Sequence, residues 1–376
     1  MDLSAQEAVP EIAAEDLLRG QPCIVDVRSP AEYREGSVPG AFNLPLLDDS
    51  ERELVGRLYH EEGADEARMG AMRVTSPKLA RYLGYVRILH ERCGPVAVMC
   101  WRGGERSGNL VRLLALVGVP ARRVRGGYRA YRRVILDRLQ NWQPERPVVT
   151  LYGYTGSGKT AILRMMADWK SVLAEGLTLR PDVLDLEGLA LHRGSLLGGL
   201  NQPGHRSQKQ FDALLWHRLQ EAEGDYVVLE GEGAKIGHIF LPSTVADAVR
   251  TGVPVLIEAG VKSRVARIIE EYHPASWGAQ ERGRFLESLE RIGARMELAA
   301  VAEVREEFEA GNYESAVETL LVSYYDPLYH RSCVAGKHFA YTLHSQGDVL
   351  EDARRLMEDL PRVLNSIDRQ AADNQR

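Results

Sequence analysis

The chain has 376 residues, of which 44% are hydrophobic and 27% charged, so it is expected to be a globular protein of two domains. Its 47 basic and 53 acidic residues give a net charge of −6, which excludes a protein that coats DNA through overall positive charge but allows local basic patches. The four cysteines show neither paired nor metal-ligand spacing, and no apolar stretch approaches the roughly 18 residues of a membrane span. The acidic start, MDLSAQEAVPEIAAED, lacks the pattern of a signal peptide, so a reducing cytoplasmic location is expected.

The first 140 residues predict a parallel α/β domain. Short apolar runs bounded by turn residues, PCIVDVR (22–28) and PVAVMC (95–100), are typical of buried strands, and a helix-like segment lies between them at residues 76–93. The segment NWQPERP (141–147) contains two prolines after a helical stretch, and it is predicted to be the linker between the domains.

Residues 148–376 predict a second parallel α/β domain with a helical C-terminal part. From about residue 260 the sequence is predicted to be helical and highly charged, and RQAADNQR (369–376) is expected to be a frayed tail. The strand candidates before that point, separated by helical stretches, are PVVTLYG (147–153), DVLDLEG (182–188), DYVVLEG (225–231) and VPVLIEAG (253–260).

Cys100 ends an apolar run and is followed at once by WRGGERSGN (101–109). A strand that leads into this loop, with a helix expected to open near Ser107, lets the backbone amides of the loop converge on an anion. Arg102 and Arg106 add fixed positive charge, and these features together favour a reactive thiolate. The alternative is a buried structural cysteine beside an ordinary turn, which gives the arginines and glycines no purpose. The remaining cysteines are interpreted as ordinary core or surface residues: Cys23, Cys93 and Cys333.

The segment IVDVRSPAEYREGSVPGAFNLP (24–45) resembles the entry segment of rhodanese domains, and VRGGYRAY (124–131) resembles their closing strand and turn. The resemblance covers most of residues 8–140 and implies that Cys100 carries sulfur or selenium. One departure matters, because Arg106 lies six residues after Cys100, as in related dual-specificity phosphatases, whereas the usual sulfurtransferase loop closes after five. The loop by itself therefore leaves sulfur, selenium and phosphate chemistry open. The family positions of the entry segment are Asp26, Arg28, Glu32, Gly36, Pro39, Gly40 and Ala41.

The segment GYTGSGKT (153–160) fits the P-loop pattern G-x-x-x-x-G-K-[ST] and lies between a strand and a helix, as that motif requires. Its amides can wrap around a diphosphate, Lys159 can reach the terminal oxygens, and the Thr160 hydroxyl can ligate Mg²⁺. Glu230, at the end of another strand, is the candidate that supports the metal, with a solvent-facing acid as the alternative. The predicted diphosphate-binding residues are Gly153, Tyr154, Thr155, Gly156, Ser157, Gly158, Lys159 and Thr160.

A second polar cluster is expected near the P-loop. His192, Arg193 and Ser195 follow a strand candidate, at the end where open α/β sheets bind ligands, although a lone histidine on a turn is as often structural. Four arginines occupy positions typical of phosphate-binding lids, and one or two of them are expected to contact phosphate: Arg264, Arg267, Arg282 and Arg284.

The order of CWRGGERSG, GYTGSGKT, HRGSLLGG and YYDPLY closely resembles the tRNA 2-selenouridine synthase family over about residues 8–365. The resemblance implies that the 2-thio group of a wobble uridine is alkylated by geranyl diphosphate at the P-loop, and that the S-geranyl group leaves when selenium from selenophosphate enters. Cys100 would accept the selenium, and Arg102 and Arg106 would hold the phosphate or the transferred atom.

The same resemblance defines the expected partners. They are tRNA, selenophosphate and the enzyme that supplies it, with Mg²⁺ as cofactor and with no haem, flavin, zinc or membrane. The geranyl chain needs an apolar pocket, for which Leu196, Leu197 and Phe240 are the candidates.

RNA binding is predicted at PARRVRGGYRAYRR (120–133), which contains six arginines and no acid. Arginines suit backbone phosphates, and Tyr128 and Tyr131 suit an unstacked base; a solvated helix face over two core tyrosines is an equal alternative. Charge reversal at Arg129 and Arg132 is predicted to weaken tRNA binding and to flatten its salt dependence. The segment SYYDPLYHRS (323–332) is a second candidate. The six arginines are Arg122, Arg123, Arg125, Arg129, Arg132 and Arg133.

Three other functions stay open. The first is a P-loop phosphotransferase fused to a phosphatase-like cysteine loop, against which the lack of a strand-terminal aspartate counts. The second is a tRNA sulfurtransferase, which only the resemblance disfavours. The third is an RNA-binding module with an inert rhodanese domain, against which the intact Cys100 argues. No motif specifies which tRNAs are chosen or the oligomeric state.

Overall fold

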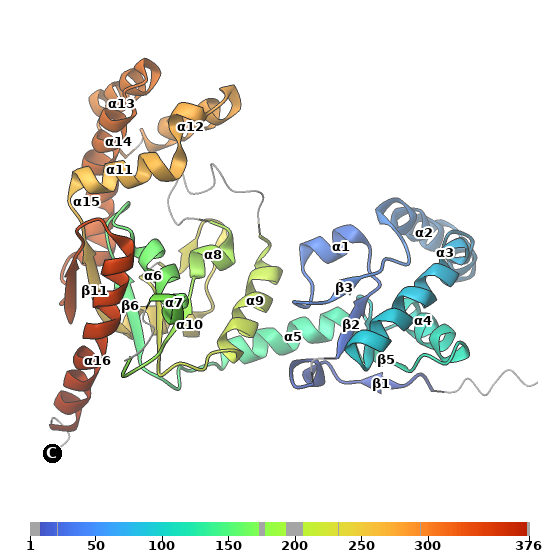
Figure 1. Cartoon of the computed structure of the whole chain (residues 1–376). Helices are drawn as coiled ribbons and strands as arrows, with labels where there is room; N and C mark the ends of the chain where they lie inside the picture. The colour runs from blue at the N-terminus through green and yellow to red at the C-terminus, as the bar shows by residue number, and fades with distance from the viewer. Residues whose placement is uncertain are drawn as a thin grey trace, which may run out of the picture. The chain divides into compact units, whose positions relative to one another are not determined.

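The computed structural model describes residues 8–20, 22–172, 177–192, 206–231, 233–293 and 295–373, without the side chains of 171 and 368–373 (Figure 1). It divides into two compact units, Met1–Leu139 with Ser207–His217, and Gln140–Arg206 with Arg218–Arg376. Within the described part of the chain, no helix has the length and apolar character needed to cross a membrane.

The first unit is built on a sheet of five strands that all run parallel, which confirms the predicted parallel α/β architecture. Two strands at the centre of this sheet, CIVD and VAVM, are fully buried because both faces of the sheet are covered, as is usual for parallel sheets. In spatial order the strands are β1 (Glu11–Ile12), β5 (Ala121–Val124), β4 (Val96–Met99), β2 (Cys23–Asp26) and β3 (Phe42–Asn43).

The helices of the first unit connect these strands. The helix expected at residues 76–93 begins much earlier and continues through Pro77, because the preceding residues also favour a helix. A capping box, in which Ser29 and Glu32 satisfy each other's backbone amides, starts the short helix that carries Glu32. The helices are η1 (Glu15–Leu18), α1 (Pro30–Glu35), α2 (Asp49–Glu61), α3 (Ala64–Cys93), α4 (Glu105–Leu116) and α5 (Gly127–Gln140).

The second unit contains a second five-stranded parallel sheet, in which all four predicted strands are confirmed. A fifth strand, β12, lies at one edge and was missed, because four residues within a charged, helical region carry no readable alternation. In spatial order the strands are β12 (Tyr341–His344), β11 (Val253–Glu258), β6 (Val148–Tyr152), β8 (Tyr226–Glu230) and β7 (Pro181–Leu184).

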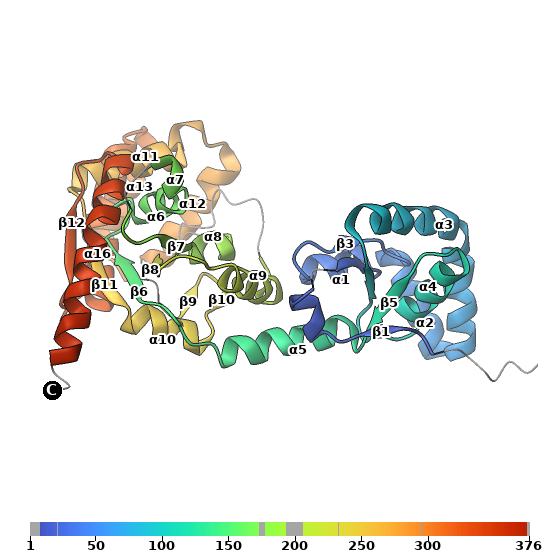
Figure 2. The same ribbon diagram turned by 60° about the horizontal axis from the view of Figure 1, so that its bottom comes forward.

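Helices cover this sheet and extend beyond it as the predicted helical C-terminal part. Apolar residues of α6 (Lys159–Ala167) and α16 (Val349–Asp373) share one core with the sheet, and α16 lies beside the β12 edge in Figure 2. The hairpin β9 (Lys235–Ile236) and β10 (Ile239–Phe240) follows β8. The other helices are α7 (Trp169–Val172), α8 (Leu186–Ala190), α10 (Ser243–Thr251), α11 (Val261–Tyr272), η2 (Pro274–Ser276), α12 (Ala279–Ile292) and α13 (Leu298–Ala310).

One continuous helical rod follows α13. It consists of α14 (Tyr313–Leu320), η3 (Leu321–Tyr325), α15 (Asp326–Tyr329) and η4 (His330–Val334). The segments η3 and η4 are π-helical. This geometry is rare in proteins, and where it occurs it often lies at a functional site.

Most of α9 (Gln208–Gln220) belongs to the first unit, although its sequence lies between β7 and β8 of the second. The Ser37 amide donates to Gln210 Oε1 at 2.8 Å, and Arg132 on α5 forms a 2.6 Å ion pair with Asp212. This membership differs from the expectation that residues 148–376 form one domain, because the contacts that hold α9 are made by side chains far away in the sequence.

The pair of Arg132 and Asp212 should contribute strongly to stability. Asp212 is only 4% exposed, so Arg132→Met leaves an uncompensated buried carboxylate, and we expect a loss of ~3 kcal/mol in the free energy of unfolding, measured by urea denaturation. Burial raises the pKa of Asp212 although Arg132 opposes it. A raised folded-state pKa makes protonation stabilising, so the loss should shrink as the pH is lowered from 7.

The double variant Arg132→Met, Asp212→Asn is the control, because it leaves no buried charge. It should recover much of the lost stability. Equal losses in the single and double variants would mean that packing, and not the ion pair, is responsible.

Candidate functional site

Cys100 lies directly after β4 and is only 3% exposed. Its Sγ is 3.2 Å from the Ser107 hydroxyl on α4, which begins at Glu105, two residues before the predicted start. The amides of Tyr128 and Arg129, at the start of α5, donate to the carbonyls of Cys100 at 2.9 Å and Trp101 at 3.0 Å. The thiol is thus fixed between the amino-terminal ends of two helices, the geometry that favours bound anions.

The glycines around Cys100 permit a close approach of two backbone segments. Gly127 has φ +58°, and a Cβ at this residue would lie 2.2 Å from the Cys100 carbonyl oxygen. Gly103 has φ +65°, and its Cβ would lie 2.4 Å from the Val124 carbonyl oxygen. Any side chain at either position would push the loop away from α5, so this contact explains why both segments carry paired glycines.

The charges of the cysteine loop are already partly paired. Arg106 forms a 2.7 Å ion pair with Glu32 on α1, whereas Arg102 is exposed. Burial works to lower the pKa of Arg106, but the hydrogen bond and charge of Glu32 outweigh it, and the pKa is raised. Burial likewise works to raise the pKa of Glu32, and Arg106 holds it below its usual value. Arg106 is therefore a permanent cation whose position depends on Glu32, a role that the sequence did not reveal.

Beneath the loop lies a second, fully buried pair. Arg28 donates to Asp26 at 2.6 Å and to the Gly36 carbonyl at 2.7 Å, and its guanidinium lies 3.9 Å from the centroid of the Tyr128 ring. This network joins β2, α1 and α5, and so it holds the scaffold of the loop.

The P-loop joins β6 to α6, in the predicted strand and helix context. Gly156 (φ +77°) and Gly158 (φ +91°) adopt left-handed backbone conformations that favour glycine. A Cβ on Gly153 would lie 2.4 Å from the Ser157 hydroxyl and 2.9 Å from the carbonyl oxygen of Ile257 on β11. The three glycines thus allow the loop to fold tightly over the sheet edge.

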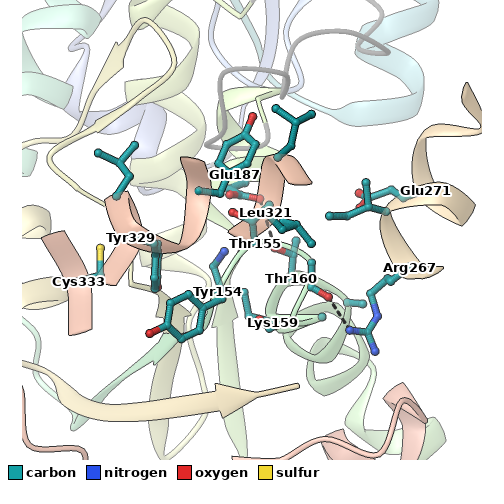
Figure 3. Close-up of a pocket in the computed structure, with 18 of the residues that line it drawn as sticks. Tyr154, Thr155, Lys159, Thr160, Glu187, Arg267, Glu271, Leu321, Tyr329 and Cys333 are labelled. Atoms are coloured by element: carbon teal, nitrogen blue, oxygen red, sulfur yellow. Dashed lines mark hydrogen bonds between the residues drawn. The ribbon is translucent and has the colours of Figure 1, made fainter. Parts of the chain in front are cut away.

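The acid beside Thr160 is Glu187 on α8, and not Glu230. The Thr160 hydroxyl donates to Glu187 Oε2 at 3.2 Å (Figure 3). Glu230 is fully buried, accepts a 2.9 Å hydrogen bond from the Leu186 amide and does not line the cavity described below. Glu230 therefore does not lie beside Thr160, because its Oε2 accepts from the start of α8, and its support of a metal stays a prediction. An acid three residues after the end of β7, in DVLDLEG, was the available signal for Glu187.

The donor set of Thr160 and Glu187 fits Mg²⁺. A hydroxyl and a carboxylate are hard oxygen ligands, and Mg²⁺ at phosphate sites uses few protein ligands, with waters and phosphate oxygens completing its shell. In the described ranges, no group of three or more His, Cys, Asp or Glu side chains forms a metal cage.

Two of the predicted arginines contact the P-loop backbone. Arg267 donates to the Gly156 carbonyl at 2.7 Å, and Arg264 donates to the Thr155 carbonyl at 2.9 Å. Arg264 also forms a bidentate pair with Asp326 of α15 (2.6 and 3.0 Å), so it links the P-loop to the helical rod.

The remaining members of the polar cluster are less informative. The His192 ring packs against Gly237, where a Cβ would lie 2.5 Å from its Cδ2. Arg193 and Ser195 lie outside the described residues. Arg282 contacts the Tyr313 hydroxyl and the Trp277 carbonyl, away from the P-loop, and Arg284 lies on the same helix.

Aromatic residues of the rod and the P-loop meet. The Gly153 amide donates to the Tyr329 hydroxyl at 3.0 Å, and the Tyr154 hydroxyl lies 2.9 Å from His330 Nδ1. Figure 3 shows Lys159, Tyr154 and Tyr329 gathered together. Tyr324 and Tyr325 are buried and line the cavity together with Tyr329, so the tyrosines of residues 323–332 form a wall of the P-loop site. The basic residues His330 and Arg331 are exposed, and RNA binding by this segment stays a prediction.

A cavity of about 1060 Å³ begins at the P-loop and continues between the C-terminal helices. Its polar end contains Lys159, Thr160, Glu187 and Arg267, and the rest is mainly apolar. Phe240 is 60% exposed and lies outside the cavity, which corrects its assignment to the apolar pocket. Leu196 and Leu197 lie outside the described residues. The apolar lining from the C-terminal helices includes Ile268, Ile269, Phe285, Phe308, Val317, Leu320, Leu321 and Leu328.

The predicted RNA surface is only partly available. Arg123 and Arg125 are paired with Glu11, and Arg132 with Asp212. Tyr128 is 1% exposed and Tyr131 is fully buried, so neither ring can stack on a base; the prediction for Tyr128 was wrong because these rings fill the core beneath α5. The exposed arginines of the segment are Arg122, Arg125, Arg129 and Arg133, and of these Arg125 is paired with Glu11.

The two units thus define an enzyme class: a rhodanese-like domain with a fixed thiol, combined with a P-loop domain whose P-loop opens into a mainly apolar cavity. Two family models match the chain, the "Rhodanese-like domain" over residues 9–133 and the "tRNA 2-selenouridine synthase AAA domain" over residues 146–358. The chain belongs to the tRNA 2-selenouridine synthase family and is an enzyme.

Curated relatives agree with this assignment. Proteins named tRNA 2-selenouridine synthase are 32% identical in Hydrogenovibrio crunogenus (81% of this chain, 88% of the relative) and 32% identical in Nitrosomonas europaea (70% and 67%). A third, from Chromohalobacter salexigens, is 29% identical over 94% of this chain and 100% of its own length. The similarity therefore extends through both domains.

Proposed function

We propose that this enzyme converts 2-thiouridine at the wobble position of tRNA to 2-selenouridine, through an S-geranyl intermediate, with geranyl diphosphate and selenophosphate as substrates. Membership of the family supports the overall reaction. The observation that carries the geranyl step is the cavity, because a phosphate site that continues into an apolar interior suits a diphosphate with a hydrocarbon tail better than a nucleotide.

In the first step the uridine sulfur attacks C1 of the geranyl group, so that a C–S bond forms and the allylic C–O bond breaks. The negative charge develops on the departing diphosphate, within reach of the P-loop amides and Lys159. Thr160 and Glu187 would hold Mg²⁺, which supplies further neutralisation of that charge when bound. Arg264 and Arg267 keep the P-loop backbone in place.

In the second step selenium of selenophosphate adds to C2 of the uridine, and the C2–S bond breaks to release geranylthiol. Water then cleaves the P–Se bond, which gives phosphate and 2-selenouridine without a change in oxidation state. The Cys100 loop is the site we assign to selenophosphate, because Arg106 is a permanent cation there and helix amino termini flank the thiol.

The exposed arginines of residues 120–133 should carry tRNA binding. We expect Arg129→Glu, Arg133→Glu to weaken tRNA affinity about tenfold and to lower the slope of log K against log salt by about 2, because two phosphate contacts are lost. Arg132 is left unchanged because its replacement would break the ion pair with Asp212 and destabilise the fold.

The matched control is Arg57→Glu, Arg92→Glu, which makes the same charge change at exposed positions on α2 and α3. Affinity can be followed by fluorescence titration at several salt concentrations. If both double variants behave alike, only net charge matters and the surface is misassigned.

The reaction itself is tested with the wild-type enzyme and tRNA that carries 2-thiouridine. Geranyl diphosphate is added first and selenophosphate second, and the digested nucleosides are identified by mass spectrometry. S-geranyl-2-thiouridine followed by 2-selenouridine is the expected result. If the nucleoside is unchanged while ATP is consumed and phosphate appears on a small acceptor, a phosphotransferase replaces this proposal.

A further inference from the structure

Four aromatic side chains line the part of the cavity that lies between the C-terminal helices. Trp277, Phe285, Phe308 and Tyr313 all line the cavity, and they come from four successive segments of the helical part. The Phe285 and Phe308 rings are 4.2 Å apart, Trp277 lies 5.8 Å from each of them, and Tyr313 lies 5.4 Å from Phe308. We call these four residues the aromatic wall.

Hydrogen bonds from behind hold the aromatic wall in place. Arg282 donates to the Tyr313 hydroxyl at 2.7 Å, and its guanidinium lies 5.7 Å from the centroid of the Phe308 ring. The Trp277 indole donates to the Tyr272 carbonyl at 2.8 Å. Arg282 is half-buried and does not line the cavity, so displacement of Tyr313 would break the hydrogen bond that Arg282 donates to it.

The helical rod runs from the wall to the P-loop. From Ala316 to Cys333, pairs of adjacent side chains that recur every four positions line the cavity, so one face of the rod forms its long side. The Tyr329 hydroxyl accepts a hydrogen bond from the Gly153 amide. Tyr329 is sixteen positions after Tyr313, which corresponds to roughly 24 Å along the helix axis at about 1.5 Å per residue. The side chains between them include Ala316, Val317 and Leu321, which are small or apolar.

The geometry points to a length gauge: we propose that the aromatic wall sets the longest hydrocarbon tail that the P-loop domain accepts on a diphosphate. The inference rests on the proposed function, in which a diphosphate is bound at Lys159 and its tail follows the rod. A tail that reaches the wall must stop there, because the rings are packed against each other and fixed from behind. The wall is thus a specificity determinant that touches only the unreactive end of the substrate.

The test uses full-length protein with Mg²⁺, and calorimetry measures its dissociation constants for inorganic diphosphate and for three allylic diphosphates: geranyl, farnesyl and geranylgeranyl. Phe308→Ala removes a ring of the wall, so more of the twenty-carbon tail can be buried. Because each buried methylene strengthens binding several-fold, the affinity for the twenty-carbon tail relative to the ten-carbon tail should rise by about tenfold. Val317→Phe fills the cavity midway along the rod, so it should shift the same ratio by about tenfold in the opposite direction.

Val304→Ala is the matched control, because Val304 is fully buried on the same helix as Phe308 and does not line the cavity. It should leave the ratio of the two dissociation constants unchanged. The proposal is overturned if wild type prefers geranyl diphosphate to inorganic diphosphate but neither Phe308→Ala nor Val317→Phe changes the ratio. If wild type binds inorganic diphosphate with the same affinity as geranyl diphosphate, the cavity holds no tail. The proposed function then fails together with the length gauge.

Discussion

Replacing Lys159 by alanine is expected to abolish geranylation, with a fall in rate of about 10²–10³-fold, while selenium transfer to tRNA that already carries the S-geranyl group continues. Lys159 begins α6 and lines the polar end of the cavity. The charge that appears as the C–O bond breaks develops on the diphosphate, and a fixed cation there stabilises the transition state more than the bound substrate. Single-turnover geranylation, followed by mass spectrometry of the nucleosides, measures the effect.

Two variants define the interpretation of this result. Lys159→Arg keeps the charge and should recover part of the rate. Lys170→Ala removes an exposed lysine of α7 that does not line the cavity, and it should behave as wild type. If Lys159→Ala blocked selenium transfer to geranylated tRNA as well, the P-loop would serve both steps and the division between the two domains would be wrong.

The complementary variant, Cys100→Ala, is expected to stop the reaction at the S-geranyl nucleoside. Geranylation should proceed at the wild-type rate, and selenium incorporation should fall by at least about 10²-fold, since the group at the centre of the anion site is lost. The thiol is held 3.2 Å from the Ser107 hydroxyl. Residues 101–109 contain no other cysteine or methionine, so no other sulfur in that loop can replace it. The ratio of S-geranyl to seleno nucleoside, measured over time, gives the result directly.

Cys93→Ala is the matched control for Cys100→Ala, because Cys93 is an exposed thiol of the same unit. It should give the wild-type ratio of products. Normal selenium incorporation by Cys100→Ala would show that the thiol is dispensable and that the arginines and amides of the loop are sufficient.

Local sequence patterns determined much of the fold. Four strands of the second sheet were predicted because parallel strands covered on both faces are continuous apolar runs. The P-loop was predicted with its strand and helix because its glycines, lysine and threonine are adjacent in the sequence. The loop at Cys100 was predicted for the same reason. In each case the residues that decide the structure lie within about ten positions of one another.

Partners that are distant in the sequence were decided only by the tertiary structure. Glu187, rather than Glu230, lies beside Thr160, because the start of α8 places it there. Glu230 instead accepts a hydrogen bond from the Leu186 amide. Glu32 holds Arg106 across 74 positions. Neither contact has a spacing that a sequence motif could record.

Burial likewise had to be seen in three dimensions. Tyr128 has the composition and neighbours of an RNA-binding aromatic residue, but it faces the core under Arg28. The segment 323–332 carries basic and aromatic residues suited to a surface, yet helical packing turns its tyrosines toward the P-loop. The sequence by itself determined which chemistry the chain carries, because reactive groups and their loops are local. The fold decided which groups meet, which are buried and how far the cavity extends, because those properties depend on the packing of elements that are remote along the chain.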